Sequence, residues 1–206
     1  MKIKFLICVM FICMSVQGQN DSFELSKFDK MSWFSEAKLG IFVHWGIYSV
    51  KGISESWSFF NEYISHQDYL SQLDSFDAIN YNPKKWVELI KNSGAKYAVI
   101  TSKHHDGFAL WKTKYGYLNS VKNSASKKDL LTPFVNELKK NKLKLGLYYS
   151  LSDWSFNDYD NFTKNNKRYI ISEEPKRWEK FIKYRDNQIS ELENLFQPDI
   201  WWFDGD

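Results

Sequence analysis

Residues 83–111, PKKWVELIKNSGAKYAVITSKHHDGFALW, contain a predicted helix, a predicted strand and a group of polar side chains in immediate succession. Residues 83–92 have the pattern of a helix, with proline in its first turn and Gly94 just after its end. Residues 97–101, YAVIT, form a short apolar run that is typical of a β-strand. The polar residues 104–106, HHD, follow this strand closely.

The same succession of strands and helices continues on both sides of this stretch. Apolar runs typical of strands occur at residues 39–44 (LGIFVH), 143–149 (LKLGLYY) and 198–203 (PDIWWF), and helix patterns at residues 129–140 and 173–196. The first of these helices contains Pro133, which fits only near its first turn. Strands that are separated by helices pair in parallel through right-handed crossovers, so the sequence predicts an α/β fold.

Polar or aromatic residues stand at the end of every predicted strand, and this position favours one kind of α/β fold. A doubly wound nucleotide-binding sheet usually has a glycine-rich turn after its first strand, whereas residues 44–46 are HWG. In a (β/α)8 barrel, catalytic residues lie at the carboxyl ends of several strands. A complete barrel has about 250 residues, and only four strands are visible. We therefore expect an incomplete TIM-like barrel that comprises about the first four β/α units.

The alternation of side chains along a strand predicts which residues face the barrel axis. In residues 143–150, the alternation places Tyr149 on the same side as Leu143, Leu145 and Leu147, which would face the helices. Tyr148 would face the axis. It also places Trp202 and Asp204 on the same side of the last strand. We therefore expect Tyr148, Trp202 and Asp204 to share the mouth of the barrel.

The composition is that of a folded protein with an unusual share of aromatic rings. The chain has 206 residues, of which 43% are apolar, 26% are charged and 18% are Phe, Trp or Tyr. The formal net charge is +3, and two of the lysines lie in an N-terminal segment that we expect to be removed. Because the remaining chain is almost neutral, the charge does not indicate a nucleic-acid partner.

Residues 1–18 have the pattern of a secretory signal peptide. Lys2 and Lys4 precede an apolar run over residues 5–14, and small or modest residues at 16–18 suit a signal peptidase. The run is short for a membrane span, although an N-terminal anchor is the alternative. We therefore expect two segments, a signal peptide over 1–18 and a catalytic domain over 19–206. The mature protein would be exported to a periplasmic, extracellular or lysosome-like compartment, without a membrane attachment.

Five motifs, taken together and in this order, carry a resemblance to a known family. They are LGIFVHWGIYSV, ESW, NPKKWVELIKNSGAKYAVITSKHHDGFALW, KLGLYYSLSDW and PDIWWFDGD, preceded by Trp33 and Phe34. From about Met31 to Asp206 the chain resembles the N-terminal half of the catalytic domain of the α-L-fucosidases of glycoside hydrolase family 29. The resemblance implies a retaining exo-glycosidase (EC 3.2.1.51) that acts on fucosylated oligosaccharides or glycoconjugates and needs no cofactor.

The resemblance also implies a role for individual residues. The family's nucleophile matches Asp204, the third residue of the motif WFDG. The residues that match the family's sugar-binding positions are His44, His104, His105, Tyr148 (or Tyr149) and Trp202. In the family, the general acid/base comes from a later strand or loop. It would lie after residue 206, and we expect the 206-residue chain alone to be inactive.

The loop after the first strand departs from the family pattern. Many members have Glu directly before the Trp of this loop, whereas here that position is Ser56 and Glu55 stands one place earlier. Trp57 is therefore a better candidate for a substrate contact than Glu55.

The chemistry of glycoside cleavage agrees with these assignments. Cleavage with retention needs a carboxylate that attacks the anomeric carbon and, about 5 Å away, a carboxylic acid that protonates the leaving oxygen. Asp204 suits the first role, because Trp202 would provide a low-dielectric wall beside it. Aromatic faces pack against the apolar face of a sugar, and imidazole and phenol groups hydrogen-bond to its hydroxyls.

Several alternatives remain open from the residues alone. His104 and His105 could bind a metal, but neighbouring residues on a strand point in opposite directions and no further ligand pattern appears. Asp206 could be the nucleophile instead of Asp204, although it lies beyond the strand. Trp111, Trp154 and Trp178 are interpreted as packing residues. The other class of function is a non-catalytic half-barrel that only binds sugar.

Overall fold

The computed structural model describes residues 31–205, and the chain divides into two compact units, Met1–Lys38 and Leu39–Asp206. In the first unit, residues 31–37 form a helix. The predicted signal peptide over 1–18 and the alternative nucleophile Asp206 lie outside the described residues. Every further element described below belongs to the second unit.

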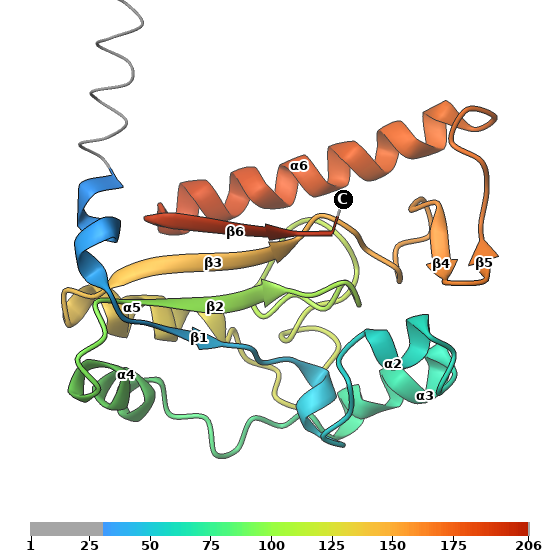
Figure 1. The fold of residues 1–206 in the computed structure, drawn as a ribbon. Coiled ribbons are helices and arrows are strands. Elements are labelled where there is room, and N and C mark those ends of the chain that lie inside the picture. The colour runs from blue at the N-terminus through green and yellow to red at the C-terminus, as the bar shows by residue number, and fades with distance from the viewer. Residues whose placement is uncertain (1–30, 206) are drawn as a thin grey trace, which may run out of the picture. The chain divides into compact units, whose positions relative to one another are not determined.

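Four parallel strands form the sheet that positions the predicted site (Figure 1). They are β1 (Gly40–Val43), β2 (Tyr97–Lys103), β3 (Lys144–Ser150) and β6 (Ile200–Asp204), in the spatial order β1-β2-β3-β6. Each neighbouring pair is parallel, so the carboxyl ends of all four strands lie at one edge of the sheet. The predicted α/β class is confirmed.

The three predicted helices connect these strands. They are α4 (Pro83–Asn92), α5 (Leu131–Lys140) and α6 (Pro175–Phe196). The amide of Lys85 donates a hydrogen bond of 3.0 Å to the side chain of Asn82, which caps α4. The start of α5 lies two residues later than predicted, and the side chain of Asp129, which precedes the helix, accepts 2.8 Å from the amide of Thr132 in its first turn. Pro133 therefore falls in the first turn, where proline is tolerated.

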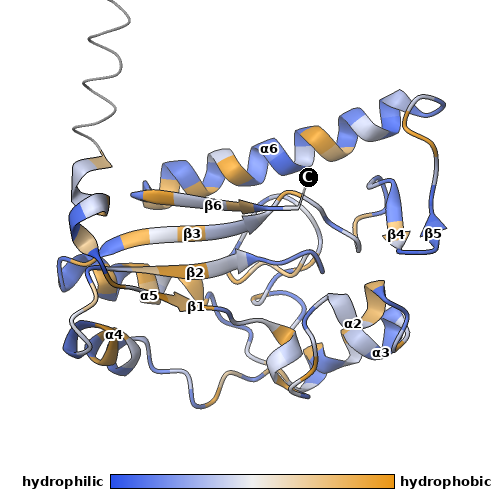
Figure 2. Cartoon of the chain, in the orientation of Figure 1, coloured by the Kyte–Doolittle hydropathy of each residue, from blue (hydrophilic) through white to orange (hydrophobic). Residues whose placement is uncertain are grey.

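The hydrophobic core lies between the sheet and its helices. Buried side chains of β2 and β3 pack against those of the helices, including Ile100, Leu145, Leu147, Phe134 and Phe181. Figure 2 shows hydrophobic and hydrophilic bands alternating along α6, as expected for a helix with one buried face. Tyr149 belongs to this layer, because its phenol donates 2.8 Å to Gln188 of α6. The predicted orientation of Tyr149 toward the helices is confirmed.

Several short elements that the sequence did not predict gather near the carboxyl edge of the sheet (Figure 1). Between β1 and α4 lie η1 (Ile47–Ser49), α2 (Trp57–Phe60), α3 (His66–Leu70) and η2 (Ser71–Ser75), and β4 (Asn161–Thr163) pairs with β5 (Asn166–Lys167). Each is five residues or shorter, so it has no periodicity that a sequence could display. Among residues 31–205, no helix combines the length and apolar character needed to cross a bilayer.

Candidate active site

The carboxyl edge of the sheet brings Asp204 together with side chains from β3 and from the loop after β2. The Tyr148 phenol donates a hydrogen bond of 2.7 Å to Asp204 Oδ2. The Nε2 atom of His105 lies 3.7 Å from the same oxygen. The amide of Gly205 donates 2.8 Å to the other oxygen, Oδ1. The carboxylate is thus held in one orientation by donors on both of its oxygens.

Asp204 is more open to solvent than the sequence suggested. Its side chain is 48% exposed, and the neighbouring Trp202 is 53% exposed, so the expected low-dielectric wall does not enclose the carboxylate within residues 31–205. Burial, followed by the hydrogen bond and charge of Asp204, raises the pKa of Tyr148. The phenol therefore keeps its proton and remains a donor to the carboxylate.

His104 and His105 both lie at this site, contrary to the expectation that they point in opposite directions. Their ring centroids are 4.4 Å apart. The alternation fails because β2 ends at Lys103 and its register against β3 shifts between Thr101 and Lys103. It is Lys103 that turns toward the helices, where its ammonium lies 4.5 Å from the centre of the Tyr149 ring.

The imidazoles of the site are kept neutral by burial. Desolvation lowers the pKa of His44, although Glu55 and Asp204 oppose it. Burial and the neighbouring histidines hold the pKa of His104 well below its usual value, and burial lowers that of His105 to about 4. At neutral pH, each ring thus has one N–H donor and one bare nitrogen acceptor, which suits neutral sugar hydroxyls. Among residues 31–205, no three His, Cys, Asp or Glu side chains are grouped to hold a metal ion.

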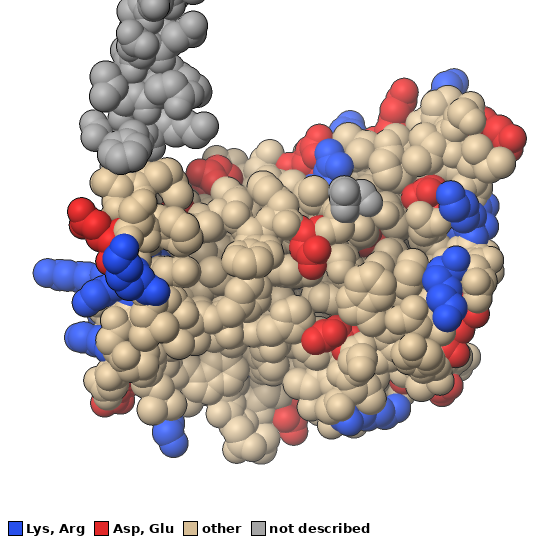
Figure 3. Space-filling model, in the orientation of Figure 1, with Lys and Arg blue, Asp and Glu red and all other residues tan. Residues whose placement is uncertain are grey.

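Aromatic rings line the site between these polar groups. Phe42 lies edge-on to Trp202 at 5.3 Å and to Tyr148 at 5.9 Å, and His104 stacks on Tyr148 at 5.6 Å. His44 lies 5.0 Å from His104. The middle of the face shown in Figure 3 is mostly uncharged. These surfaces can pack against the apolar face of a sugar ring.

Two tryptophans stand beside His105. Trp57, which the sequence singled out, is 42% exposed, and its ring lies 5.7 Å from that of His105. Trp154 was assigned to packing, and it is buried, but its ring stacks on His105 at 4.4 Å with 28° between the planes. Its amide also donates 2.7 Å to the carbonyl of His105. The sequence missed this contact, because Trp154 lies four residues after the end of β3 in a segment without a regular pattern.

The loop after β1 contributes two residues that the sequence did not place at the site. An oxygen of Glu55 lies 3.7 Å from His44 Nε2. The Ser56 hydroxyl, which is fully buried, hydrogen-bonds to Nδ1 of His104. Trp57, Glu55 and Ser56 therefore all reach the histidine cluster, and the preference for Trp57 over Glu55 as a substrate contact stays a prediction.

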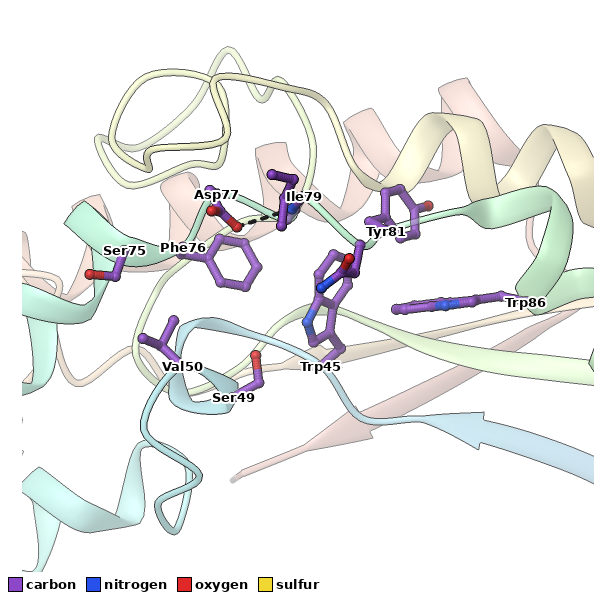
Figure 4. A pocket seen from close by; sticks show the side chains of 11 residues that line it. Trp45, Ser49, Val50, Ser75, Phe76, Asp77, Ile79, Tyr81 and Trp86 are labelled. Carbon is purple, nitrogen blue, oxygen red and sulfur yellow. Dashed lines mark hydrogen bonds between the residues drawn. The ribbon is translucent and has the colours of Figure 1, made fainter.

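A separate aromatic pocket lies between the loop after β1 and the start of α4 (Figure 4). The Trp45 ring lies 5.0 Å from Tyr81 and 5.1 Å from Trp86, and these rings line the pocket with the loop around Asp77. Its polar groups serve the local fold, since Asp77 accepts 3.0 Å from the amide of Ile79 and the Tyr81 phenol donates to a backbone carbonyl. None of the predicted site residues lines this pocket.

Comparisons with known proteins identify the family of the chain. The family model described as alpha-L-fucosidase matches residues 14–206. An alpha-L-fucosidase of Branchiostoma floridae is 33% identical over 196 residues, which cover 85% of this chain and 41% of that protein. The structure of alpha-L-fucosidase isoenzyme 1 from Paenibacillus thiaminolyticus superposes with a TM-score of 0.75 at 31% identity, covering 86% of this chain and 43% of that one.

The structure of a third relative contains a reaction intermediate. The relative is a family 29 alpha-L-fucosidase from Bacteroides thetaiotaomicron, whose structure holds a trapped covalent intermediate in complex with 2-fluoro-fucosyl fluoride. This structure superposes with a TM-score of 0.74 at 30% identity and covers 86% of this chain and 41% of that one. The chain thus spans about two fifths of the length of the relatives that it matches.

Proposed function

The chain belongs to the α-L-fucosidase family, and on this premise we propose that the full-length protein is a retaining exo-glycosidase that hydrolyses terminal α-L-fucosyl residues. The observation that carries the proposal is the Asp204 carboxylate, which Tyr148 and Gly205 orient at the open end of the sheet. Neutral imidazoles and aromatic faces surround it, as the recognition of an uncharged sugar requires. We propose oligosaccharides or glycoconjugates with terminal fucose as its substrates.

In the proposed reaction, an oxygen of Asp204 attacks the anomeric carbon while the bond from that carbon to the leaving oxygen breaks. A second carboxylic acid gives its proton to the leaving oxygen. The same group then removes a proton from water, which attacks the anomeric carbon and releases Asp204 as a carboxylate. The assignment of this second group to a segment after residue 206 stays a prediction. The covalent intermediate trapped in the Bacteroides relative supports a mechanism of this kind.

We also propose that β1, β2, β3 and β6 are the first four strands of a (β/α)8 barrel. Their parallel order, each pair connected by a segment that contains a helix, supports this arrangement. So does the location of the candidate residues at the carboxyl ends of the strands, where such barrels hold their active sites.

The full-length protein is expected to hydrolyse an aryl α-L-fucoside and to release α-L-fucose as the first product. Proton NMR of the initial product measures both the cleavage and its stereochemistry, and an aryl β-D-galactoside is the matched control substrate. Release of β-L-fucose would contradict the retaining mechanism. Binding of fucose without any turnover would instead favour the alternative of a sugar-binding protein.

We further propose that the protein is exported. The support is the basic and apolar pattern of residues 1–18, which lie outside the described part of the chain. We expect the mature protein to begin at or near Gln19. N-terminal sequencing of secreted material that still carried residues 1–18 would count against cleavage.

A further inference from the structure

Two buried serines contact the two adjacent histidines of the site in the same way. The Ser150 hydroxyl hydrogen-bonds to Nδ1 of His105, and the Ser56 hydroxyl hydrogen-bonds to Nδ1 of His104. Both serines are fully buried. A hydroxyl has one proton to donate, so the partner that receives this proton decides which way each histidine contact runs.

At His105, the hydroxyl proton of Ser150 is donated to another acceptor. The Ser150 hydroxyl donates 2.7 Å to the carbonyl oxygen of Ser152, which can only accept. The serine oxygen must therefore accept from His105, and the ring proton lies on Nδ1. Because the pKa of His105 is lowered to about 4, the ring has no second proton at neutral pH. Its Nε2 is a bare acceptor on the side of Asp204.

At His104, the geometry does not assign the direction of the contact, because among residues 31–205 the Ser56 hydroxyl has no hydrogen bond besides the one to this ring. The inference therefore concerns His105.

We propose that Ser150 is a positioning residue that holds His105 as its Nδ1–H tautomer, so that the ring accepts a proton from a substrate hydroxyl. The proposal assigns a direction to this sugar contact. One hydroxyl of the bound sugar acts as a donor to Nε2, and a sugar that lacks this hydroxyl loses that bond. The sugar part of this inference rests on the proposed function, whereas the tautomer does not.

The test is NMR of the full-length protein with ¹⁵N in its histidine rings, at neutral pH. The rings are assigned with His104→Gln and His105→Gln. We expect the ring of His105 to be protonated at Nδ1. In Ser150→Ala, the proton of His105 should move to Nε2, where the Asp204 carboxylate can accept it, and kcat/KM for an aryl fucoside should fall about tenfold. Ser150→Thr keeps a hydroxyl and should keep the Nδ1 proton.

Ser102→Ala is the matched control. Ser102 is also a buried serine, but its hydroxyl donates 2.6 Å to the carbonyl of Tyr148 instead of bonding to a histidine. It should leave the ring protonation of His105 unchanged even if it destabilises the protein. A wild-type spectrum with His105 protonated at Nε2 would overturn the proposal, whether or not the variants fold. The expected tautomer in a protein that ignores fucosides would refute the proposed function and leave the positioning role of Ser150 standing.

Discussion

Asp204→Ala is expected to lower the rate of fucoside hydrolysis by the full-length protein by about 10⁴-fold or more. The reason is that the variant retains a group to protonate the leaving oxygen but has no carboxylate to form the covalent intermediate. Comparison of kcat for the variant and the wild type on an aryl α-L-fucoside measures the loss. The fold should remain intact, because the Asp204 side chain is half exposed.

Two controls show whether the loss of activity in Asp204→Ala is due to the missing nucleophile. They are rescue by azide and the substitution of another acidic residue, Asp199. Azide can enter the vacated space as an external nucleophile, and it should restore part of the activity while producing β-fucosyl azide. Asp199 lies just before the other end of β6, where its carboxylate binds Lys144 at 2.6 Å. Asp199→Asn should keep the wild-type rate. Near-native hydrolysis by Asp204→Ala, together with an inactive Asp206→Ala, would show that Asp206 is the nucleophile.

The second large effect is expected from a buried ion pair behind the histidines. The Lys103 ammonium lies 3.4 Å from Asp153 Oδ2, and both side chains are almost completely buried. The Tyr184 phenol donates 2.9 Å to the same carboxylate oxygen. Burial lowers the pKa of Lys103, and the charge of Asp153 opposes that shift. Removal of Asp153 would leave a lysine charge without its partner in the core.

Asp153→Ala is expected to reduce the free energy of unfolding by about 3–5 kcal/mol. The loss should shrink as pH rises toward about 10.5, because burial without the opposing charge of Asp153 lowers the pKa of Lys103 further in the folded variant, which then binds fewer protons than the unfolded chain. Urea unfolding at several pH values measures both effects. The double variant Lys103→Met, Asp153→Leu removes both charges and should regain part of the stability, because the Tyr184 phenol and the amides of Ser155 and Phe156 still lose their acceptor.

A loss below about 1 kcal/mol for Asp153→Ala would show that the pair contributes little, as exposed ion pairs do.

The pair matters to the site because it connects the end of β2 to the segment that carries Trp154. Lys103 precedes the two histidines, and Trp154, which stacks on His105, follows Asp153 directly.

The regular elements of this fold were predictable because their patterns are local. The helix over residues 83–92 agrees with the structure at both ends, since proline and glycine mark its boundaries. The orientation of Tyr148 toward Asp204 and of Tyr149 toward α6 followed from the alternation of a regular strand.

The parts that were not predictable depend on contacts between distant segments. The common direction of His104 and His105 follows from a register shift against β3, which no local pattern reports. Ser56 reaches His104 across 48 residues of sequence, and Ser150 reaches His105 across 45. Serine has no pattern that distinguishes a positioning residue from an ordinary buried hydroxyl, so only the folded structure reveals these two contacts.

The most direct test of the central claim is to trap the covalent intermediate. The full-length protein is incubated with 2-fluoro-fucosyl fluoride, digested and analysed by mass spectrometry, with Asp204→Ala as the control. If Asp204 is the nucleophile of a retaining fucosidase, one fluorofucosyl group will be attached to the peptide that contains Asp204, and the variant will carry none. A label on a different residue, or an active protein that is never labelled, would contradict the account.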